Sequence, residues 1–363
     1  MGFRCGIVGL PNVGKSTLFN ALTHAGAQAE NYPFCTIDPN VGIVEVPDPR
    51  LDTIAGLVNP AKVIPTAIEF VDIAGLVAGA SKGEGLGNRF LAHIREVDAI
   101  IHVVRAFSDD DITHVSGKVD PLADAATIET ELALADLETT ERAVDRTTKA
   151  AKTGDKKILR ELGYLKQAYE ALSQDQGLQA LLQDPEASAA LKPLCLLSAK
   201  PMLYVANVSE EDLNGNDQVS KLTAHAQTRQ AQVVVVSAAI EQEISEIDAQ
   251  ERAGFLEDLG LESSGLDRVI RAGYALLGLQ TFFTAGPKEV RAWTVACGAT
   301  APQAAGEIHT DFERGFIRAE TIAYADFVEY QGEQGAREAG RLRLEGKEYI
   351  LSDGDIMHFR FNV

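Results

Sequence analysis

The chain has 363 residues, of which 45% are hydrophobic, and a formal net charge of -20. This length exceeds what one hydrophobic core usually organises, so two or three domains are expected, and the apolar content excludes disorder over most of the chain. The acidic balance argues against a protein whose whole surface coats nucleic acid or acidic membranes, so any such contact must be local.

The sequence predicts a protein of the cytoplasm that does not enter a membrane. No apolar run is long enough to span a bilayer, and residues 1–6 lack a basic leader followed by an apolar stretch. Cys5, Cys35, Cys195 and Cys297 are too far apart for a zinc or disulfide framework, which favours a reducing compartment. Nothing in the sequence demands more than a monomer.

Short apolar runs bounded by polar turns predict the buried parallel strands of an α/β doubly wound sheet. The first run ends at Val8, breaks into glycine and resumes as a helical pattern from Ser16, which predicts strand, loop and helix. The other predicted strands span residues 68–73, 99–104, 201–206 and 233–237.

A helical segment interrupts this series of strands. Leu162, Leu165, Tyr169 and Leu172 recur at helical spacing, and residues 153–155 form a turn, which predicts an inserted helical hairpin. Between residues 142 and 166, eight Lys and Arg stand against three Asp and Glu, a net charge of +5. Such a run is typical of a solvated helix face, and contact with RNA is the alternative.

The end of the chain has a different pattern. After about residue 279, short strands such as 290–295 and the alternating Met357, Phe359 and Phe361 predict a small β-rich domain. The predicted domains are a P-loop domain in two parts, 1–127 and 200–278, an inserted helical domain, 128–199, and a C-terminal domain, 279–363.

Residues 9–16 match the phosphate-loop pattern G-x-x-x-x-G-K-[ST] between a strand and a helix. In such a loop, backbone N–H groups face phosphate oxygens, the lysine neutralises the β- and γ-phosphates, and the serine hydroxyl binds Mg²⁺. Lys15 is therefore a predicted catalytic residue. The predicted nucleotide contacts in this loop are Asn12, Val13, Gly14, Lys15, Ser16 and Thr17.

A second motif, D-x-x-G, covers residues 72–75. Asp72 would hold Mg²⁺ through water, and the Gly75 N–H would reach the γ-phosphate. Thr36 is a candidate switch threonine that completes the magnesium shell, so the predicted metal ligands are Ser16, Thr36 and Asp72. Leu76 follows the motif where Ras-type enzymes place a water-orienting glutamine, and leucine cannot orient water.

These motifs, together with residues 32–37, 281–286 and 298–303, resemble the Obg-related GTPases, and the whole chain is similar to the YchF or Obg-like ATPase subfamily. The resemblance implies a G domain, an inserted antiparallel helical arm and a C-terminal TGS domain of ubiquitin-like β-grasp shape. It also implies association with the ribosome or its large subunit, in a role linked to translation or stress.

The stretch that should read the base departs from the N-K-x-D motif of ordinary GTPases. Asn207, Val208 and Glu210 stand at the Asn, Lys and Asp positions, so the lysine is absent and the carboxylate lies one methylene further out. The amide oxygen of Asn207 or the main chain could instead accept the adenine amine. The site therefore favours ATP over GTP. Three further residues, Ser237, Ala238 and Ala239, resemble the loop that lines the base from the other side.

Three residues are open to two interpretations each. Asn12 resembles the asparagine of potassium-activated relatives, so K⁺ is a candidate activator, and a simple loop-forming asparagine is the alternative. Cys35 is either a redox sensor beside Thr36 or an inert thiol. His114 lies in the polar stretch after the strand 99–104. It is the predicted residue that activates water in a site where Leu76 cannot, and a loop histidine without a role is the alternative.

Three functions remain in competition. The favoured one is a switch that hydrolyses ATP, and GTP more weakly, to the diphosphate and phosphate, and whose nucleotide state alters docking on the ribosome. The second is a GTP-specific Obg-type GTPase. The third is a ribosome-associated module that binds a nucleotide without significant turnover.

Overall fold

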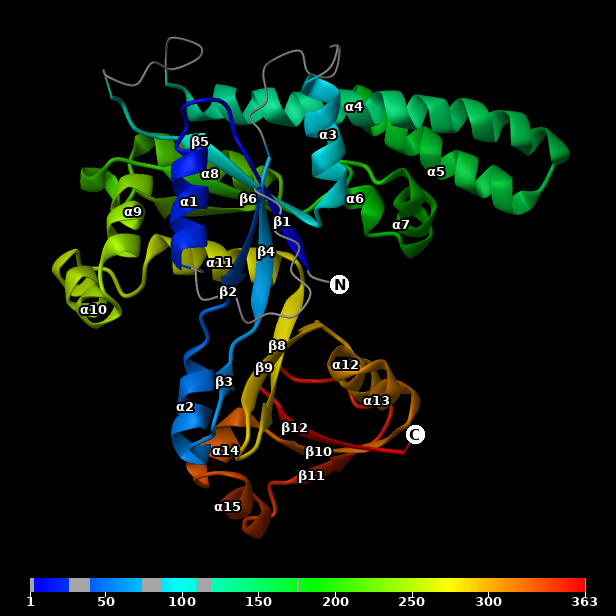
Figure 1. Ribbon diagram of the computed structural model, residues 1–363. Helices are drawn as coiled ribbons and strands as arrows, with labels where there is room; N and C mark the ends of the chain where they lie inside the picture. Colours follow the sequence, from blue (N-terminus) through cyan, green and yellow to red (C-terminus); the bar gives the residue numbers. More distant parts are fainter. Residues whose placement is uncertain (1–2, 26–39, 74–85, 110–118, 175, 363) are drawn as a thin grey trace. The chain divides into compact units, whose positions relative to one another are not determined.

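A computed structural model describes residues 3–25, 40–73, 86–109, 119–174 and 176–362 (Figure 1). The chain forms two compact units. The first comprises Met1–Gly42 and Glu69–Val269, and the second Ile43–Ile68 and Ile270–Val363. Within the described part of the chain, no helix combines the length and the apolar character needed to cross a membrane.

The first unit is built on a six-stranded sheet of order β2-β4-β1-β5-β6-β7. The strands are β1 (Arg4–Val8), β2 (Val41–Glu45), β4 (Ala67–Asp72), β5 (Ala99–Arg105), β6 (Met202–Asn207) and β7 (Gln232–Val236). From β4 to β7 every neighbouring pair is parallel, which confirms the five predicted strands and the α/β class. The edge strand β2 was not predicted, because buried and half-buried side chains alternate along its five residues and leave no continuous apolar run.

Helices flank this sheet (Figure 1). Their bounds are α1 (Lys15–Ala25), α3 (Leu86–Glu96), α8 (Asp217–Thr228), α9 (Ala238–Glu246), α10 (Ala249–Asp258) and α11 (Gly265–Leu276). Helix α8 and the first turns of α4 cover the strands β5 and β6, in a core that includes Val104, Ala125 and Tyr204. Helix α1 packs against α9. The two helices that follow the phosphate loop and the predicted base loop are therefore in contact.

The predicted helical hairpin is confirmed as a long arm made of α4 (Pro121–Ala150) and α5 (Lys156–Ser173) (Figure 1). A 3₁₀ turn, η3 (Ala151–Thr153), joins them, and Gly154 follows it with a φ of 77°, which glycine adopts without strain. Leu165 and Leu172 are buried between the helices, as their spacing predicts. Two short helices, α6 (Gln179–Leu182) and α7 (Pro185–Leu191), and a 3₁₀ turn, η4 (Lys192–Leu194), complete the arm.

Two buried carboxylates of α4 fix the arm at its root. Asp136 accepts hydrogen bonds from the backbone N–H groups of Leu197 and Ser198, at 2.8 and 2.7 Å. Burial raises the pKa of Asp136, and these bonds oppose that shift. Glu129 accepts from the Tyr204 hydroxyl on β6, and it pairs with two side chains of α8, His225 at 2.8 Å and Arg229 at 2.6 Å.

Two further titratable side chains lie in the core of the first unit. His102 on β5 is fully buried, and its ring centroid lies 5.4 Å from that of Tyr204. Burial and the neighbouring His225 lower the pKa of His102 to about 3, so the ring is neutral at physiological pH. Cys5 is also fully buried, and burial raises the pKa of its thiol to about 12, which leaves it unreactive.

The second unit contains a mixed sheet of order β11-β10-β12-β8-β9-β3. Its strands are β3 (Val63–Ile64), β8 (Leu279–Ala285), β9 (Val290–Ala296), β10 (Phe316–Ile322), β11 (Arg343–Glu345) and β12 (Ile356–Phe361). Strands β8 and β9 form an antiparallel hairpin, and β12 runs parallel to β8. Helix α12 (Ala301–Ile308) packs on this sheet. This arrangement confirms the predicted β-grasp fold. Three short helices, α13 (Thr310–Arg314), α14 (Tyr324–Glu329) and α15 (Glu333–Glu338), complete the unit.

A segment from early in the chain belongs to this second unit. Helix α2 (Pro49–Val58) buries Leu51 and Ile54 in a core shared with strands β8 and β12, and β3 adds to the sheet beside β9. Arg50 is hydrogen-bonded to Asp353, at 2.7 Å. The predicted domain bounds put these residues in the first part of the P-loop domain. An amphipathic pattern predicts a half-buried segment, but it does not specify which surface that segment will cover.

Candidate nucleotide site

The phosphate loop has the backbone that its sequence pattern requires. Asn12 and Gly14 have φ angles of 64° and 91°, in the left-handed region that asparagine tolerates and glycine adopts freely. At Gly9, a Cβ would lie 2.7 Å from the carbonyl oxygen of Val103 on β5, so any larger residue would displace the loop. This backbone also gives a structural reason for asparagine at position 12.

The buried side chain of Asn207 joins the phosphate loop to the predicted base loop. Its Nδ2 donates to the carbonyl oxygen of Val13 at 2.9 Å, and its Oδ1 accepts from the N–H of Ala238 at 2.9 Å. Asn207 ends β6, and Ala238 begins α9. Glutamine or aspartate could not make both bonds from this position, because one is too long and the other has no donor.

The phosphate end of the site carries charged and hydroxyl groups. The ammonium group of Lys15 contacts the carboxylate of Asp72, at the end of β4. Ser16 is exposed in the first turn of α1. Carboxylate and hydroxyl oxygens are the hard ligands that Mg²⁺ prefers. These two residues therefore fit a magnesium ion held next to a bound phosphate.

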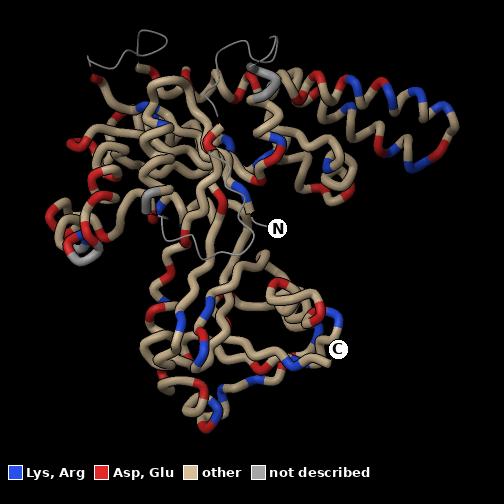
Figure 2. Tube along the Cα trace, in the orientation of Figure 1, with Lys and Arg blue, Asp and Glu red and all other residues tan. Residues whose placement is uncertain are grey.

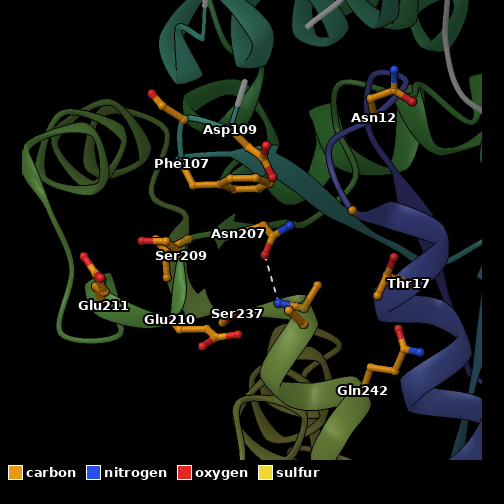
Figure 3. Close-up of a pocket in the computed structure, with 15 residues that line it drawn as sticks. Asn12, Thr17, Phe107, Asp109, Asn207, Ser209, Glu210, Glu211, Ser237 and Gln242 are labelled. Carbon is orange, nitrogen blue, oxygen red and sulfur yellow. Dashed lines mark hydrogen bonds between the residues drawn. The ribbon is translucent and has the colours of Figure 1, made fainter. Parts of the chain in front are cut away.

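A cavity of about 630 Å³ adjoins the phosphate loop (Figure 3). Nine of the predicted nucleotide contacts line it, namely Asn12, Gly14, Thr17, Asn207, Val208, Glu210, Ser237, Ala238 and Ala239. The other three, Val13, Lys15 and Ser16, do not line this cavity. Residues that are distant in the sequence therefore converge on one pocket, and they come from the ends of β1, β6 and β7.

Six residues that the sequence motifs do not mark line the same cavity, namely Phe107, Ser108, Asp109, Ser209, Glu211 and Gln242. The first three directly follow β5. Ligands of a parallel sheet gather at the carboxyl ends of its strands, so this position after a predicted strand was a usable signal. Gln242 lies one turn into α9, where no motif marks it.

The residues that replace the N-K-x-D motif have different environments. Val208 is 2% exposed, packs in the core under α8, and donates its N–H to Val236 at 2.8 Å. Glu210 is exposed at the start of a 3₁₀ turn, η5 (Glu210–Asp212), on the pocket wall. Position 208 is therefore a core position, and position 210 is free to vary in length.

Five residues that the sequence motifs single out lie outside the described residues. They are Thr36, Cys35, Gly75, Leu76 and His114.

The loop between β1 and α1 lies at the carboxyl ends of the parallel strands and next to a cavity. A loop of this sequence in this position defines the P-loop class of nucleotide-binding proteins with a G domain. The chain is 61% identical to the ribosome-binding ATPase YchF of Haemophilus ducreyi and 59% identical to that of Bacillus subtilis, in each case over 100% of both chains. It belongs to the YchF family.

Two further comparisons agree with this membership. Residues 4–136 match a family described as 50S ribosome-binding GTPase, and residues 279–362 match the YchF-GTPase C-terminal family, described as a protein of unknown function. The solved structure of the Schizosaccharomyces pombe YchF GTPase superimposes with a TM-score of 0.90 at 38% identity, covering 99% of this chain and 98% of that one. Since the match covers both units, the predicted family is confirmed over the full length.

The Asn207 bridge predicts the effect of a single-atom change. In Asn207→Asp, a buried carboxylate oxygen would face the carbonyl oxygen of Val13 and have no proton to donate. We expect the free energy of unfolding to fall by about 1 to 3 kcal/mol, measured by urea denaturation. Asn214→Asp makes the same change at an exposed position and should alter stability by less than about 0.5 kcal/mol. Equal effects of the two substitutions would contradict the bridge.

Proposed function

We propose that this protein binds ATP in the cavity beside the phosphate loop, hydrolyses it to ADP and phosphate, and docks on the ribosome according to its nucleotide state. The observation that carries the proposal is that the Asn207 bridge joins the phosphate loop to the start of α9 on the wall of one cavity. The contact between Lys15, which follows the loop, and Asp72 supports it. Its full-length relatives from Haemophilus ducreyi and Bacillus subtilis are ribosome-binding ATPases, which supports the same activity here.

At the phosphate end, Lys15 would neutralise the β- and γ-phosphates. Ser16 and Asp72, with Thr36, would hold Mg²⁺, which when bound neutralises phosphate charge and supplies fixed positive charge during phosphoryl transfer. A bound triphosphate would compete with Asp72 for the Lys15 ammonium group. K⁺ beside Asn12 is part of the same proposal.

At the base end, the pocket wall is a mixture of flat apolar and polar groups. The Phe107 ring offers a surface on which a purine can stack, and the second lone pair of the Asn207 Oδ1 can accept the adenine amine. Guanine instead needs a carboxylate to accept from its N1–H and N2 amine. Glu210, exposed on the wall, is longer than the aspartate that GTP-specific proteins use there.

We therefore expect ATP to bind more tightly than GTP, as measured by calorimetry. Glu210→Asp should shift the ratio of the two affinities toward GTP by about fivefold or more, because a mispaired buried base contact costs about 1 to 3 kcal/mol. Val208→Lys is a poor partner for this test, since it would place an ammonium group in the core. Glu211→Asp, on the same wall, is the matched control. Equal or tighter binding of GTP by the unaltered protein would overturn the ATP preference.

We further propose that His114 activates the attacking water. Asp109 lines the cavity, and His114 follows it five residues later in the sequence. Five residues span at most about 18 Å, so the length of the intervening chain permits an approach to a phosphate bound there. An unperturbed imidazole is largely neutral at physiological pH and can accept a proton from water or orient it.

The test of this role separates turnover from binding. In His114→Ala, phosphate release from ATP should fall by about 10²-fold or more, while the affinity for a non-hydrolysable ATP analogue stays within about twofold. His358→Ala, an exposed histidine of the second unit, should change neither quantity. Unchanged turnover in His114→Ala would remove the role. Absence of phosphate release from the unaltered protein, with and without ribosomes and K⁺, would instead favour the module without turnover.

The helical arm is the proposed contact with ribosomal RNA. Eight of its basic residues lie on either side of the turn between α4 and α5, where Figure 2 shows Lys and Arg along the far half of the hairpin. Arg142 pairs with Glu138 and Arg160 with Glu186. Four lysines, Lys149, Lys152, Lys156 and Lys157, are exposed, and no described carboxylate forms an ion pair with them. Such free cations can bind RNA phosphates and release counterions.

Reversing these four charges to glutamate should weaken ribosome co-sedimentation by at least tenfold at about 0.1 M salt and lower the salt dependence of binding. The control reverses four exposed cations of the second unit, namely Lys288, Arg314, Arg318 and Lys347. If only this control set lowered co-sedimentation, the C-terminal domain would be the RNA contact and not the arm.

A further inference from the structure

Arg105, the last residue of β5, is a buried cation beside the nucleotide cavity. Its side chain is among the largest in the described residues that solvent does not reach, with 1% of the residue exposed. Its Nε donates to the carbonyl oxygen of Phe107, and its Nη2 to that of Asp109, each at 3.2 Å. These two bonds hold the chain that leaves β5 in a fixed curve.

The same guanidinium group also lies against the Phe107 ring. Its central carbon is 4.6 Å from the ring centroid, in the range of cation–π contacts. Phe107 and Asp109 line the cavity, and Figure 3 shows them near Asn207 on its wall. The Ala106 N–H donates to the carbonyl oxygen of Asn207 at 2.8 Å, which ties the start of this curve to the end of β6.

Packing alone does not explain an arginine at this position. The preceding residues of β5, Val103 and Val104, fill the core at no electrostatic cost, whereas burying a guanidinium is expensive unless its donors are satisfied. Two of its donors bind the carbonyl oxygens of Phe107 and Asp109, residues that line the cavity. Arginine suits this task because its planar fork donates in several directions and stacks on an aromatic face at the same time.

We propose that Arg105 is a positioning residue for the purine base. It holds Phe107 from one side, so that the ring presents a flat apolar wall to a base in the cavity. This inference rests on the proposed binding of a purine nucleotide. Because every base has a stacking face, the wall contributes equally to adenine and guanine nucleotides, and it contributes nothing to a ligand that consists of phosphates alone.

The test compares ligands with and without a base. In Arg105→Met, the affinities for ATP and for GTP, measured by calorimetry, should each fall about tenfold, while the ratio between them stays within about twofold. The affinity for inorganic tripolyphosphate should stay within about twofold of the unaltered protein. Arg105→Lys keeps the charge but cannot make both carbonyl bonds and the ring contact, so it should give a smaller loss. An equal loss for tripolyphosphate would assign Arg105 a structural role only and overturn the proposal.

A double-mutant cycle tests whether Arg105 acts through the ring. Phe107→Leu should weaken ATP binding about tenfold by itself, and adding Arg105→Met should then weaken it by less than about twofold. Additive losses would overturn the proposal. If Arg105→Met does not fold, the same cycle with Arg105→Lys decides the question.

The unaltered protein separates the two levels of inference. If it binds ATP with high affinity and the Arg105 variants bind equally well, only the positioning role is wrong. If it binds tripolyphosphate but neither ATP nor GTP, the proposed function falls and the role of Arg105 falls with it.

Discussion

The bridge made by the Asn207 amide is the constraint on which the rest of the nucleotide site depends. One side chain holds the carbonyl of Val13 in the phosphate loop and the N–H of Ala238 at the start of α9. The bridge also restricts the loop, because a Cβ at Gly14 would lie 2.2 Å from the Asn207 Nδ2. The glycine that curves the loop and the asparagine that anchors it therefore require each other. The two ends of the pocket cannot move apart without breaking a buried hydrogen bond.

Strands β5 and β6 connect this pocket to the root of the helical arm. Asn207 ends β6, and three residues earlier the same strand carries Tyr204, whose hydroxyl donates to Glu129 of α4. Arg105 ends β5, and three residues earlier that strand carries His102, whose ring contacts that of Tyr204 at an angle of 35°. Parallel strands place their carboxyl ends at one edge of the sheet, so β5 and β6 form a pocket wall there. Residues further back on the same two strands contact the root of the arm. The arm is thus anchored to the central strands of the first unit.

The charge of the chain is unevenly distributed in a way that fits two different tasks. The protein as a whole is acidic, yet the turn of the arm carries exposed lysines. Buried charges follow another rule, because each is satisfied by specific partners. Glu129 meets Arg229 and His225, Asp136 meets backbone N–H groups, and Arg105 meets backbone carbonyls. Exposed cations remain available to a partner, while buried charges hold elements of the fold in place.

Features that a local pattern encodes could be predicted from the amino-acid sequence. The glycine spacing of the phosphate loop, the five apolar strand runs and the helical period of the arm each reflect contacts within a short stretch of backbone, so they could be predicted without a structure. Only the tertiary structure decided that residues 43–68 join the second unit and that Arg105, Phe107 and Gln242 belong to the site. Those assignments depend on which distant parts of the chain come into contact. The sequence around a residue is the same whichever distant surface its side chain contacts in the folded protein.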